Sequence, residues 1–228
     1  VIDEQHRFGV EQRASLQKKG IHPHVLIMTA TPIPRTMTLS VYGDLDVSFI
    51  KGMPPGRHPV KTYVVGSHML QRIFRFMKKE MESGHQAYVV CPLVEQSEKQ
   101  DLAAAVSVYE NLRDHVFPQF GVGLVHGRMK NAEKEQVMED FRKGKFKLLV
   151  ATSVIEVGVN VPDATVMFVY GADRFGLSQL HQLRGRVGRG KEQAYCVLYT
   201  DNQNETTQLR MKLMCEIRDG ALLAEKDL

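Results

Sequence analysis

The sequence predicts an α/β fold in which a parallel sheet is flanked by helices. Short apolar segments of strand length recur between residues 61 and 199 and alternate with segments whose apolar residues follow helical spacing. Glycines stand where two of these helices are expected to end, at Gly84 and Gly144, and glycine readily adopts the left-handed conformation of a helix terminus. Strands that alternate with helices of this length indicate a parallel sheet with both faces covered.

The first fifty residues resemble an incomplete unit of the same kind. Apolar and polar patterning predicts strands at 1–3, 24–28 and 46–50, with helices at 9–19 and 34–43 between them. The segment GMPPGRHP, residues 52–59, follows. Adjacent prolines disfavour both helix and sheet. We therefore expect two α/β units joined by a linker.

The second unit is predicted to contain six strands, at 61–65, 87–91, 122–126, 147–151, 165–169 and 194–199. Ser67 is expected to cap a helix that ends at Gly84, and Asn131 one that ends at Gly144. Further helices are expected at 101–116 and 177–190, and a helix outside the sheet at 204–219.

The amino-acid composition limits which kinds of protein this sequence can encode. Hydrophobic residues make up 43% of the 228 residues and charged residues 25%, with a net charge of +4, which permits nucleic-acid binding without requiring it. Three cysteines without C-x-x-C spacing predict free thiols in a reducing compartment, with neither disulfides nor a zinc site. No apolar run reaches the ~18 residues of a membrane span and no signal peptide is visible, so we expect a cytoplasmic protein without a membrane partner.

The segment LSQLHQLRGRVGRG, residues 177–190, crowds arginines and glycines together. If a helix continues through it, Gln182, Arg186 and Arg189 share one face, whereas Arg184 falls off that line. Two guanidinium groups on one face suit a polyanion such as a triphosphate. The alternative is a solvated basic helix, although such a helix gains nothing from its glycines.

Polar motifs follow several of the predicted strands. They are DEQH (3–6), TATP (29–32), HGRMK (126–130) and the segment ATSVIEVGVNVP (151–162). Because sites in open parallel sheets collect at the carboxyl ends of the strands, we expect these motifs and the arginine helix to converge on one edge.

Each motif also has a simpler interpretation. DEQH could hold Mg²⁺ on a nucleotide and polarise a water, or be two surface acids at a turn; TATP alone could be a loop cap. In HGRMK, Arg128 and Lys130 suit a phosphodiester backbone, or a solvated loop. The hydroxyl groups and amides of residues 151–162 are suited to binding phosphates. The alternative is that these residues form a β-branched core segment with a turn, which would leave Gly158 and Asn160 unexplained.

The motifs DEQH, TATP, TSVIEVGVNVP and QLRGRVGR, in this order, resemble motifs II, III, V and VI of superfamily 2 helicases. Longer stretches are similar to the RecG family of bacterial translocases that remodel stalled replication forks: VIDEQHRFGVEQR, MTATPIPRTM, YGDLD, PPGR, GLVHGRMK, FGLSQLHQLRGRVGRG and DGALLAEKDL. Transcription-repair coupling translocases share RFGV, TATPIPRT and LHQLRGRVGR, but are less similar over PPGR, PLVEQSE and the tail.

The resemblance implies a RecA-like P-loop NTPase fold. Residues 1–51 would be the C-terminal portion of a first helicase lobe, 52–60 the linker, 61–203 the second lobe, and 204–228 the start of a translocation hairpin.

The resemblance also assigns roles within the first lobe. Asp3 and Glu4 would bind Mg²⁺ through ATP and activate water, and His6 would couple that site to the rest of the protein. Thr29 and Thr31 would link the state of the nucleotide to the grip on DNA.

In the second lobe, Gly158 and Asn160 would face the nucleotide, with Asn160 in place of the family's usual aspartate, and Thr152 would contact a DNA phosphate. Gln182, Arg186 and Arg189 would reach across the cleft, the arginines as fingers on the γ-phosphate of ATP.

The segment Gly185–Lys191 mimics a phosphate loop, but Glu192 replaces the required Ser or Thr and no strand precedes it. The resemblance therefore places the family's phosphate-loop lysine before Val1. It places the rest of the translocation hairpin and the wedge domain outside the 228 residues. We expect the 228-residue chain alone to be inactive, and its first fifty residues either to be disordered or to pair with another copy of the chain.

The longer parent is expected to be a monomeric, nucleoid-associated bacterial enzyme of DNA repair and recombination. Its cofactors would be ATP and Mg²⁺, and its partners branched double-stranded DNA, namely forks and Holliday junctions, and single-stranded DNA-binding protein.

Three alternatives remain open at this stage. The chain could be a binding or self-associating module without turnover, which a DNA-stimulated ATPase assay would reveal. It could belong to a transcription-repair coupling translocase. It could also be an RNA helicase, because the motor motifs are shared, and competition between DNA forks and structured RNA would decide that.

Overall fold

The computed structural model describes most of the second unit and short parts of the first. The described residues are 1–2, 24–29, 46–48, 50, 56–92, 98–152 and 161–226. The predicted helices at 9–19 and 34–43 lie outside these residues.

Six parallel strands form the central sheet, in the order β1-β6-β5-β2-β4-β3. Their bounds are β1 Lys61–Val65, β2 Gln86–Cys91, β3 Val122–Val125, β4 Leu148–Thr152, β5 Ala164–Val169 and β6 Tyr195–Tyr199. Every residue of β2, β4 and β5 is buried, as expected for central strands covered on both faces. The fold predicted from the apolar segments is confirmed.

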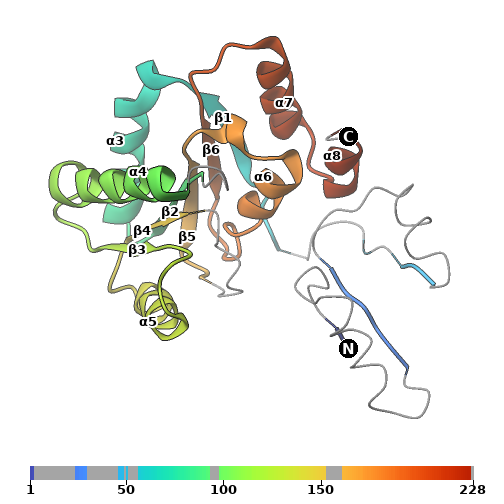
Figure 1. Ribbon diagram of the computed structural model, residues 1–228, viewed down its shortest axis with the longest axis horizontal. Helices are drawn as coiled ribbons and strands as arrows, with labels where there is room; N and C mark the ends of the chain where they lie inside the picture. Colours follow the sequence, from blue (N-terminus) through green and yellow to red (C-terminus); the bar gives the residue numbers. More distant parts are fainter. Residues whose placement is uncertain are drawn as a thin grey trace.

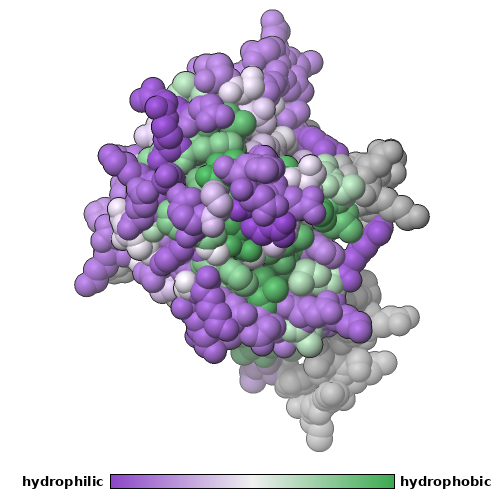
Figure 2. Space-filling view, turned by 90° about the vertical axis from the view of Figure 1, so that its left-hand side faces the viewer, coloured by the Kyte–Doolittle hydropathy of each residue, from purple (hydrophilic) through white to green (hydrophobic). Residues whose placement is uncertain are grey.

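One face of the sheet is covered by α3 (Leu70–Glu82) and α4 (Glu98–Asn111), which continues as a π-helical turn at Leu112–Val116 (Figure 1). A 3₁₀ turn at Ser67–Met69 precedes α3. Buried apolar residues of both helices pack against the sheet, among them Phe74, Met77, Ala105 and Leu112. Polar side chains cover the outer surface on this side of the molecule, with apolar ones visible between them (Figure 2).

The other face packs against α5 (Asn131–Arg142), α6 (Leu177–Arg184), α7 (Glu205–Glu216) and α8 (Gly220–Lys226). A 3₁₀ turn at Ala172–Arg174 leads into α6. The last three helices lie together beside β1 and β6 (Figure 1). Met211 and Met214 of α7 and Leu223 of α8 belong to the same hydrophobic core as Leu180 of α6. The core of the lobe therefore continues past residue 203.

Several expected boundaries were wrong. The arginine helix ends at Arg184, with Gly185 as its C-cap, instead of running to residue 190. Gly188 in the loop beyond it adopts a left-handed conformation, φ +70°. Ser67 makes no side-chain cap; its N–H donates to Asp201 Oδ1 at 2.7 Å. Asn131 is the first residue of α5, and the Lys130 N–H before it donates to the Glu133 carboxylate at 3.1 Å.

The first unit shows one pairing among its described residues. Ile2 and Ile27 form an isolated parallel bridge, in which the Ile2 N–H donates to Leu26 O and the Met28 N–H to Ile2 O, both at 2.8 Å. This agrees with the strands expected at 1–3 and 24–28. The described residues of the strand expected at 46–50 are not in a strand, since none of them pairs with another described segment.

Candidate nucleotide and nucleic-acid sites

The loop after α6 lies at the edge of the sheet where the strands begin. α6 leaves the carboxyl end of β5 and the chain must return to the start of β6, so the helix runs opposite to the strands. The Gly188 N–H donates to the main-chain oxygen of Ala164, the first residue of β5, at 3.3 Å. A Cβ on Gly190 would lie 2.6 Å from the Pro162 oxygen. Arg186 and Arg189 are therefore at the amino edge.

This position corrects the expectation that all the motifs converge on one edge. Thr152 ends β4 and Arg128 follows β3, so both lie at the carboxyl edge. The five residues of β4 separate the two edges, roughly 16 Å at the usual rise of a strand. The helical-face argument for Arg186 and Arg189 was also wrong, because both residues follow the end of α6.

At the amino edge the two arginines form a positively charged cluster with Arg57 of the linker. Burial lowers the pKa of Arg189, and the positive charges of Arg186 and Arg57 lower it further. The Arg189 Nε–H donates to the Gly185 main-chain oxygen at 3.4 Å. The guanidinium group remains protonated nonetheless, because arginine does not lose its proton in proteins.

The cluster carries no counter-charge within the described part of the chain. No described carboxylate lies within ion-pair distance of Arg57, Arg186 or Arg189. The buried Tyr88 hydroxyl is close enough for both Arg186 and Arg189 to act on it, although burial outweighs them and raises its pKa to about 12. The Tyr88 hydroxyl is therefore neutral and does not balance the charge of the two guanidinium groups. Because these groups also have no described acidic partner, the site is suited to an external anion.

The other residues expected to face the nucleotide are only partly described. Gly158 and Asn160 lie outside the described residues, but Asn160 directly precedes Val161, which is buried beside Pro162 at the same amino edge. Gln182 lies half-buried in the last turn of α6. The structure thus brings Gln182, Arg186 and Arg189 to the same side of the lobe as Val161.

At the carboxyl edge, two buried polar atoms lack hydrogen-bond partners. Thr152 is 0% exposed and its Oγ1 makes no hydrogen bond within the described part of the chain, and neither does Nδ1 of His126. The two residues are neighbours, because Val125 pairs with Ala151 in the register of β3 and β4. Unpaired buried polar atoms are costly. A pair of them at a strand edge therefore indicates a ligand position.

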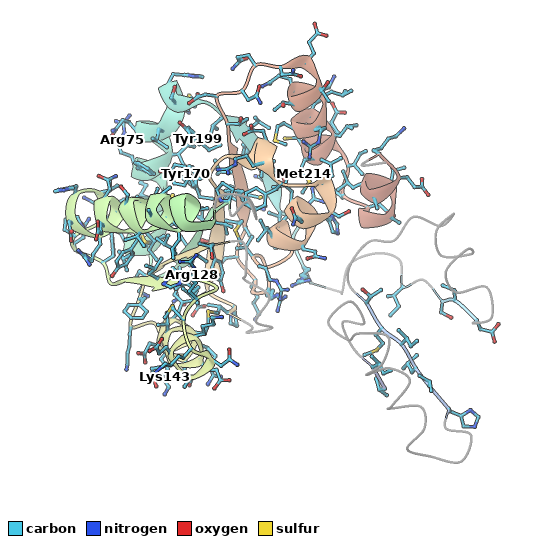
Figure 3. All side chains as sticks on the ribbon, in the orientation of Figure 1. Arg75, Arg128, Lys143, Tyr170, Tyr199 and Met214 are labelled. Atoms are coloured by element: carbon cyan, nitrogen blue, oxygen red, sulfur yellow. The ribbon has the colours of Figure 1, made fainter. Side chains whose placement is uncertain are left out.

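Basic side chains surround this pair. Arg128 and Lys130 are exposed on the turn after β3, and Figure 3 shows Arg128 beside that strand. Lys134 of α5 donates to the Gly127 oxygen at 2.8 Å. Burial lowers the pKa of His126, and the charges of Lys134 and Arg128 act in the same direction. The imidazole is thus held neutral inside a basic surface that suits a phosphodiester backbone.

The predicted acidic site of the first lobe falls almost entirely outside the described residues. Asp3, Glu4, His6 and Thr31 lie outside the described residues, and Thr29 is exposed two residues after Ile27. No group of three or more potential metal ligands occurs among the residues that the structure describes. No helix within the same residues is long and apolar enough to span a membrane.

Comparison with known proteins identifies the family. Residues 67–191 match the helicase conserved C-terminal domain. The chain belongs to that family. The whole chain is also similar to "ATP-dependent DNA helicase RecG" of Bacillus subtilis (54% identical over 228 residues, 33% of the relative) and of Thermotoga maritima (49% identical over 228 residues, 29% of the relative). The chain spans about a third of the length of these relatives.

Solved structures agree with this assignment. The structure of RecG bound to a three-way DNA junction has a TM-score of 0.82 and 45% identity, covering 99% of this chain and 29% of that one. A similar fold occurs in Saccharomyces cerevisiae Dbp5 bound to RNA and ADP BeF₃ (TM-score 0.66, 13% identity, 93% of this chain and 56% of that one). The helicase domain is therefore a RecA-like lobe.

Sequence reasoning misses two residues of these sites. His126 begins the HGRMK motif, and its only signal is its place one residue beyond a buried strand. Arg57 lies in PPGR, whose prolines indicate only a linker. Its approach to Arg189 depends on tertiary contacts that spacing along the chain does not reveal.

Proposed function

We propose that this domain is the second motor lobe of an ATP-dependent DNA helicase that remodels branched DNA in repair and recombination. The observation that supports it most strongly is the cluster of guanidinium groups at the amino edge without described acidic partners. The triphosphate of ATP has the charge to match that cluster. The names of the relatives, ATP-dependent DNA helicase RecG, point to the same cofactor and to DNA.

In this mechanism the two edges of the lobe have different tasks. Arg186 and Arg189 contact the γ-phosphate of ATP held by a first lobe, and stabilise the charge that develops during transfer of the phosphoryl group. Asp3 and Glu4 would hold Mg²⁺, which neutralises phosphate charge. Thr152, His126 and Arg128 hold the DNA backbone at the opposite edge. Closure of the two lobes around ATP then moves the DNA-binding edge.

The arrangement of the two edges supports a motor in preference to a passive binding module, since a module needs no second anion site about one strand length away. Branched duplex DNA is proposed as the substrate from the similarity to the RecG structure with a three-way junction. Single-stranded DNA-binding protein as a partner, a monomeric parent and a place at the bacterial nucleoid in the cytoplasm are proposed from the same resemblance.

The test is ATP turnover by a protein that contains this chain together with an upstream first lobe. The 228 residues contain no G-x-x-x-x-G-K-[ST] motif, so we expect the chain alone to hydrolyse no ATP. In the longer protein, Arg189→Ala should lower fork-stimulated turnover by about 10³-fold or more, while binding of a non-hydrolysable ATP analogue is largely retained.

Arg75→Ala is the matched control, since Arg75 is exposed on α3 away from both sites (Figure 3). Normal turnover by Arg189→Ala would contradict the proposal, and so would equal loss of turnover and analogue binding. Wild-type protein without DNA-stimulated turnover would favour the passive module. Stronger stimulation by structured RNA than by forks would favour an RNA helicase.

A further inference from the structure

The end of the linker is fixed against the loop that carries the arginines. The Lys61 N–H donates to the main-chain oxygen of Ala194 at 3.0 Å. The side-chain amide of Gln193 donates to the Pro59 oxygen at 2.9 Å. These two bonds hold residues 59–61 beside the chain that follows Arg189, before β1 and β6 begin their parallel pairing.

Gly188 lies between the two arginines, and its lack of a side chain allows the linker to pack closely against this loop. Its φ is +70°, and a Cβ placed on it would lie 3.2 Å from Val60 Cγ2 and 4.0 Å from the His58 oxygen. A larger residue would therefore push the linker away. His58 directly follows Arg57, so this packing determines where the Arg57 backbone lies relative to Arg186 and Arg189.

Among the residues that the structure describes, no negative charge offsets the positive charges at this position. Arg57 is half-buried, and its charge acts on Arg189 together with that of Arg186. No described carboxylate forms an ion pair with any of the three. Like charges that converge without a counter-ion repel one another. A phosphate group between them would relieve that repulsion and bind to several N–H donors at once.

We propose that Arg57 is a third phosphate-binding arginine, which contacts the same polyphosphate as Arg186 and Arg189 and ties the linker to the nucleotide. The inference rests on the proposed function, because it assigns a further ligand to the nucleotide site. It makes the linker responsive to the nucleotide: when the phosphates leave, repulsion between the three guanidinium groups favours movement of Arg57 away from the loop.

Binding of inorganic tripolyphosphate to the 228-residue chain tests this proposal directly. Calorimetric titration at constant ionic strength should show saturable binding by the wild type. Arg57→Ala should weaken binding by about tenfold or more, as expected for loss of a charged hydrogen bond. Arg57→Lys should recover part of the affinity, because it restores the charge without the planar fork. Arg75→Ala should bind as the wild type does.

The three arginines are compared to separate this inference from the proposed function. If Arg186→Ala and Arg189→Ala weaken binding and Arg57→Ala does not, the nucleotide site stands and the role of Arg57 is overturned. If none of the three variants changes binding, or the wild type shows no saturable binding, the role of Arg57 is overturned, whereas the proposed function is decided by turnover of the longer protein. Thermal unfolding without ligand shows whether each variant is folded, and Arg57→Lys serves in place of an unfolded Arg57→Ala.

A duplex DNA titration distinguishes the two sources of phosphate. We expect Arg57→Ala to leave the affinity for a 30-base-pair duplex within about twofold of the wild type, since Thr152 and Arg128 lie at the other edge. If Arg57→Ala weakens duplex binding but leaves tripolyphosphate binding unchanged, Arg57 contacts DNA and the nucleotide assignment is overturned.

Discussion

The Arg184 guanidinium group donates from Nη1 to the main-chain oxygen of Met214 at 2.9 Å. The same nitrogen donates to the Ile217 oxygen at 3.0 Å, and Nη2 donates to the Arg218 oxygen at 3.3 Å. Met214 lies in the last turn of α7, where main-chain oxygens lack partners within the helix, and Ile217 and Arg218 follow the helix directly. Figure 3 shows Met214 on α7 facing α6. Arg184 thus holds α7 onto α6, unlike its two neighbouring arginines.

Replacing Arg184 should therefore destabilise the lobe. Arg184→Ala leaves three carbonyls without a donor in a place where the side chain is only 7% exposed, and we expect a loss of about 2–4 kcal/mol of unfolding free energy. Urea denaturation measures it. Arg75→Ala on the exposed surface should stay within about 0.5 kcal/mol of the wild type. An equally small effect of Arg184→Ala would show that these hydrogen bonds contribute little.

The glycines after α6 should differ in their tolerance of alanine. Gly188 has φ +70°, and a Cβ there would lie 3.1 Å from the Ala194 Cβ, so Gly188→Ala should cost at least about 1–2 kcal/mol. Gly185 has φ −70° and its nearest obstacle is 3.4 Å away, so Gly185→Ala should be neutral or stabilise by up to about 1 kcal/mol. Thermal melting compares the two.

Gly84→Ala separates backbone strain from crowding. Gly84 has φ +96°, and a Cβ added to it would have no other atom within 4 Å, so its alanine variant should show the strain alone. A Gly188→Ala variant as stable as Gly185→Ala would mean that the loop moves freely away from the linker, which would contradict the close packing described above.

Most of the sheet could be predicted from the sequence because its strands are continuous apolar runs. The expected strand at 87–91 and the observed β2, Gln86–Cys91, differ by one residue. That residue, Gln86, is polar, and it is buried because its Nε2 donates to the Phe141 and Phe146 oxygens at 2.6 and 2.8 Å. The pattern of apolar residues cannot predict that a polar side chain is buried with hydrogen-bond partners from distant parts of the chain.

The site was harder to predict because helical spacing continued through residues that do not form a helix. Leu180, Leu183 and Val187 recur at the spacing of one helical face and all three are buried, although Val187 follows the end of α6. Spacing could not distinguish a helix from a loop that happens to bury the same side chains. The direction of that loop, toward Pro162 and Ala164, depends on contacts between distant parts of the chain.

The free energy of unfolding should decrease as the pH falls, because His181 becomes protonated. Burial and the charge of Arg184 lower its pKa from 6.5 to about 4, while Asp219 opposes them, and its Nδ1 lies 2.9 Å from Arg184 Nη2. Because the folded-state pKa is below the unfolded one, the contribution is complete above pH 6.5 and is lost as the pH falls toward 4. The loss should be at most about 3 kcal/mol, reduced by solvent screening.

His181→Asn provides the control, since its side-chain oxygen can accept from Arg184 without titrating. Between pH 7 and 5 its unfolding free energy should be flatter than that of the wild type in urea denaturation. Carboxylates such as Glu139, whose pKa is lowered to about 2 by Arg142, lose their contribution at lower pH than this. Parallel curves for His181→Asn and the wild type would assign the loss to other groups.

Thr152→Val should separate folding from DNA binding. The Thr152 hydroxyl is buried without a hydrogen-bond partner, so an isosteric valine removes an unsatisfied polar group and should leave stability unchanged or raise it by up to about 1 kcal/mol. If that hydroxyl contacts a DNA phosphate, the same change should weaken binding to a fork by about five- to tenfold. Fluorescence anisotropy with labelled fork DNA measures the affinity.

Thr165→Val is the matched control for this prediction. Thr165 is also buried in the sheet, 2% exposed, but its hydroxyl donates to Glu80 Oε2 at 2.7 Å. Its valine variant should therefore lose about 1 kcal/mol of stability and bind the fork as the wild type does. If instead Thr152→Val destabilises the lobe and leaves fork affinity intact, the hydroxyl serves the fold, and the carboxyl edge loses its principal candidate for a phosphate contact.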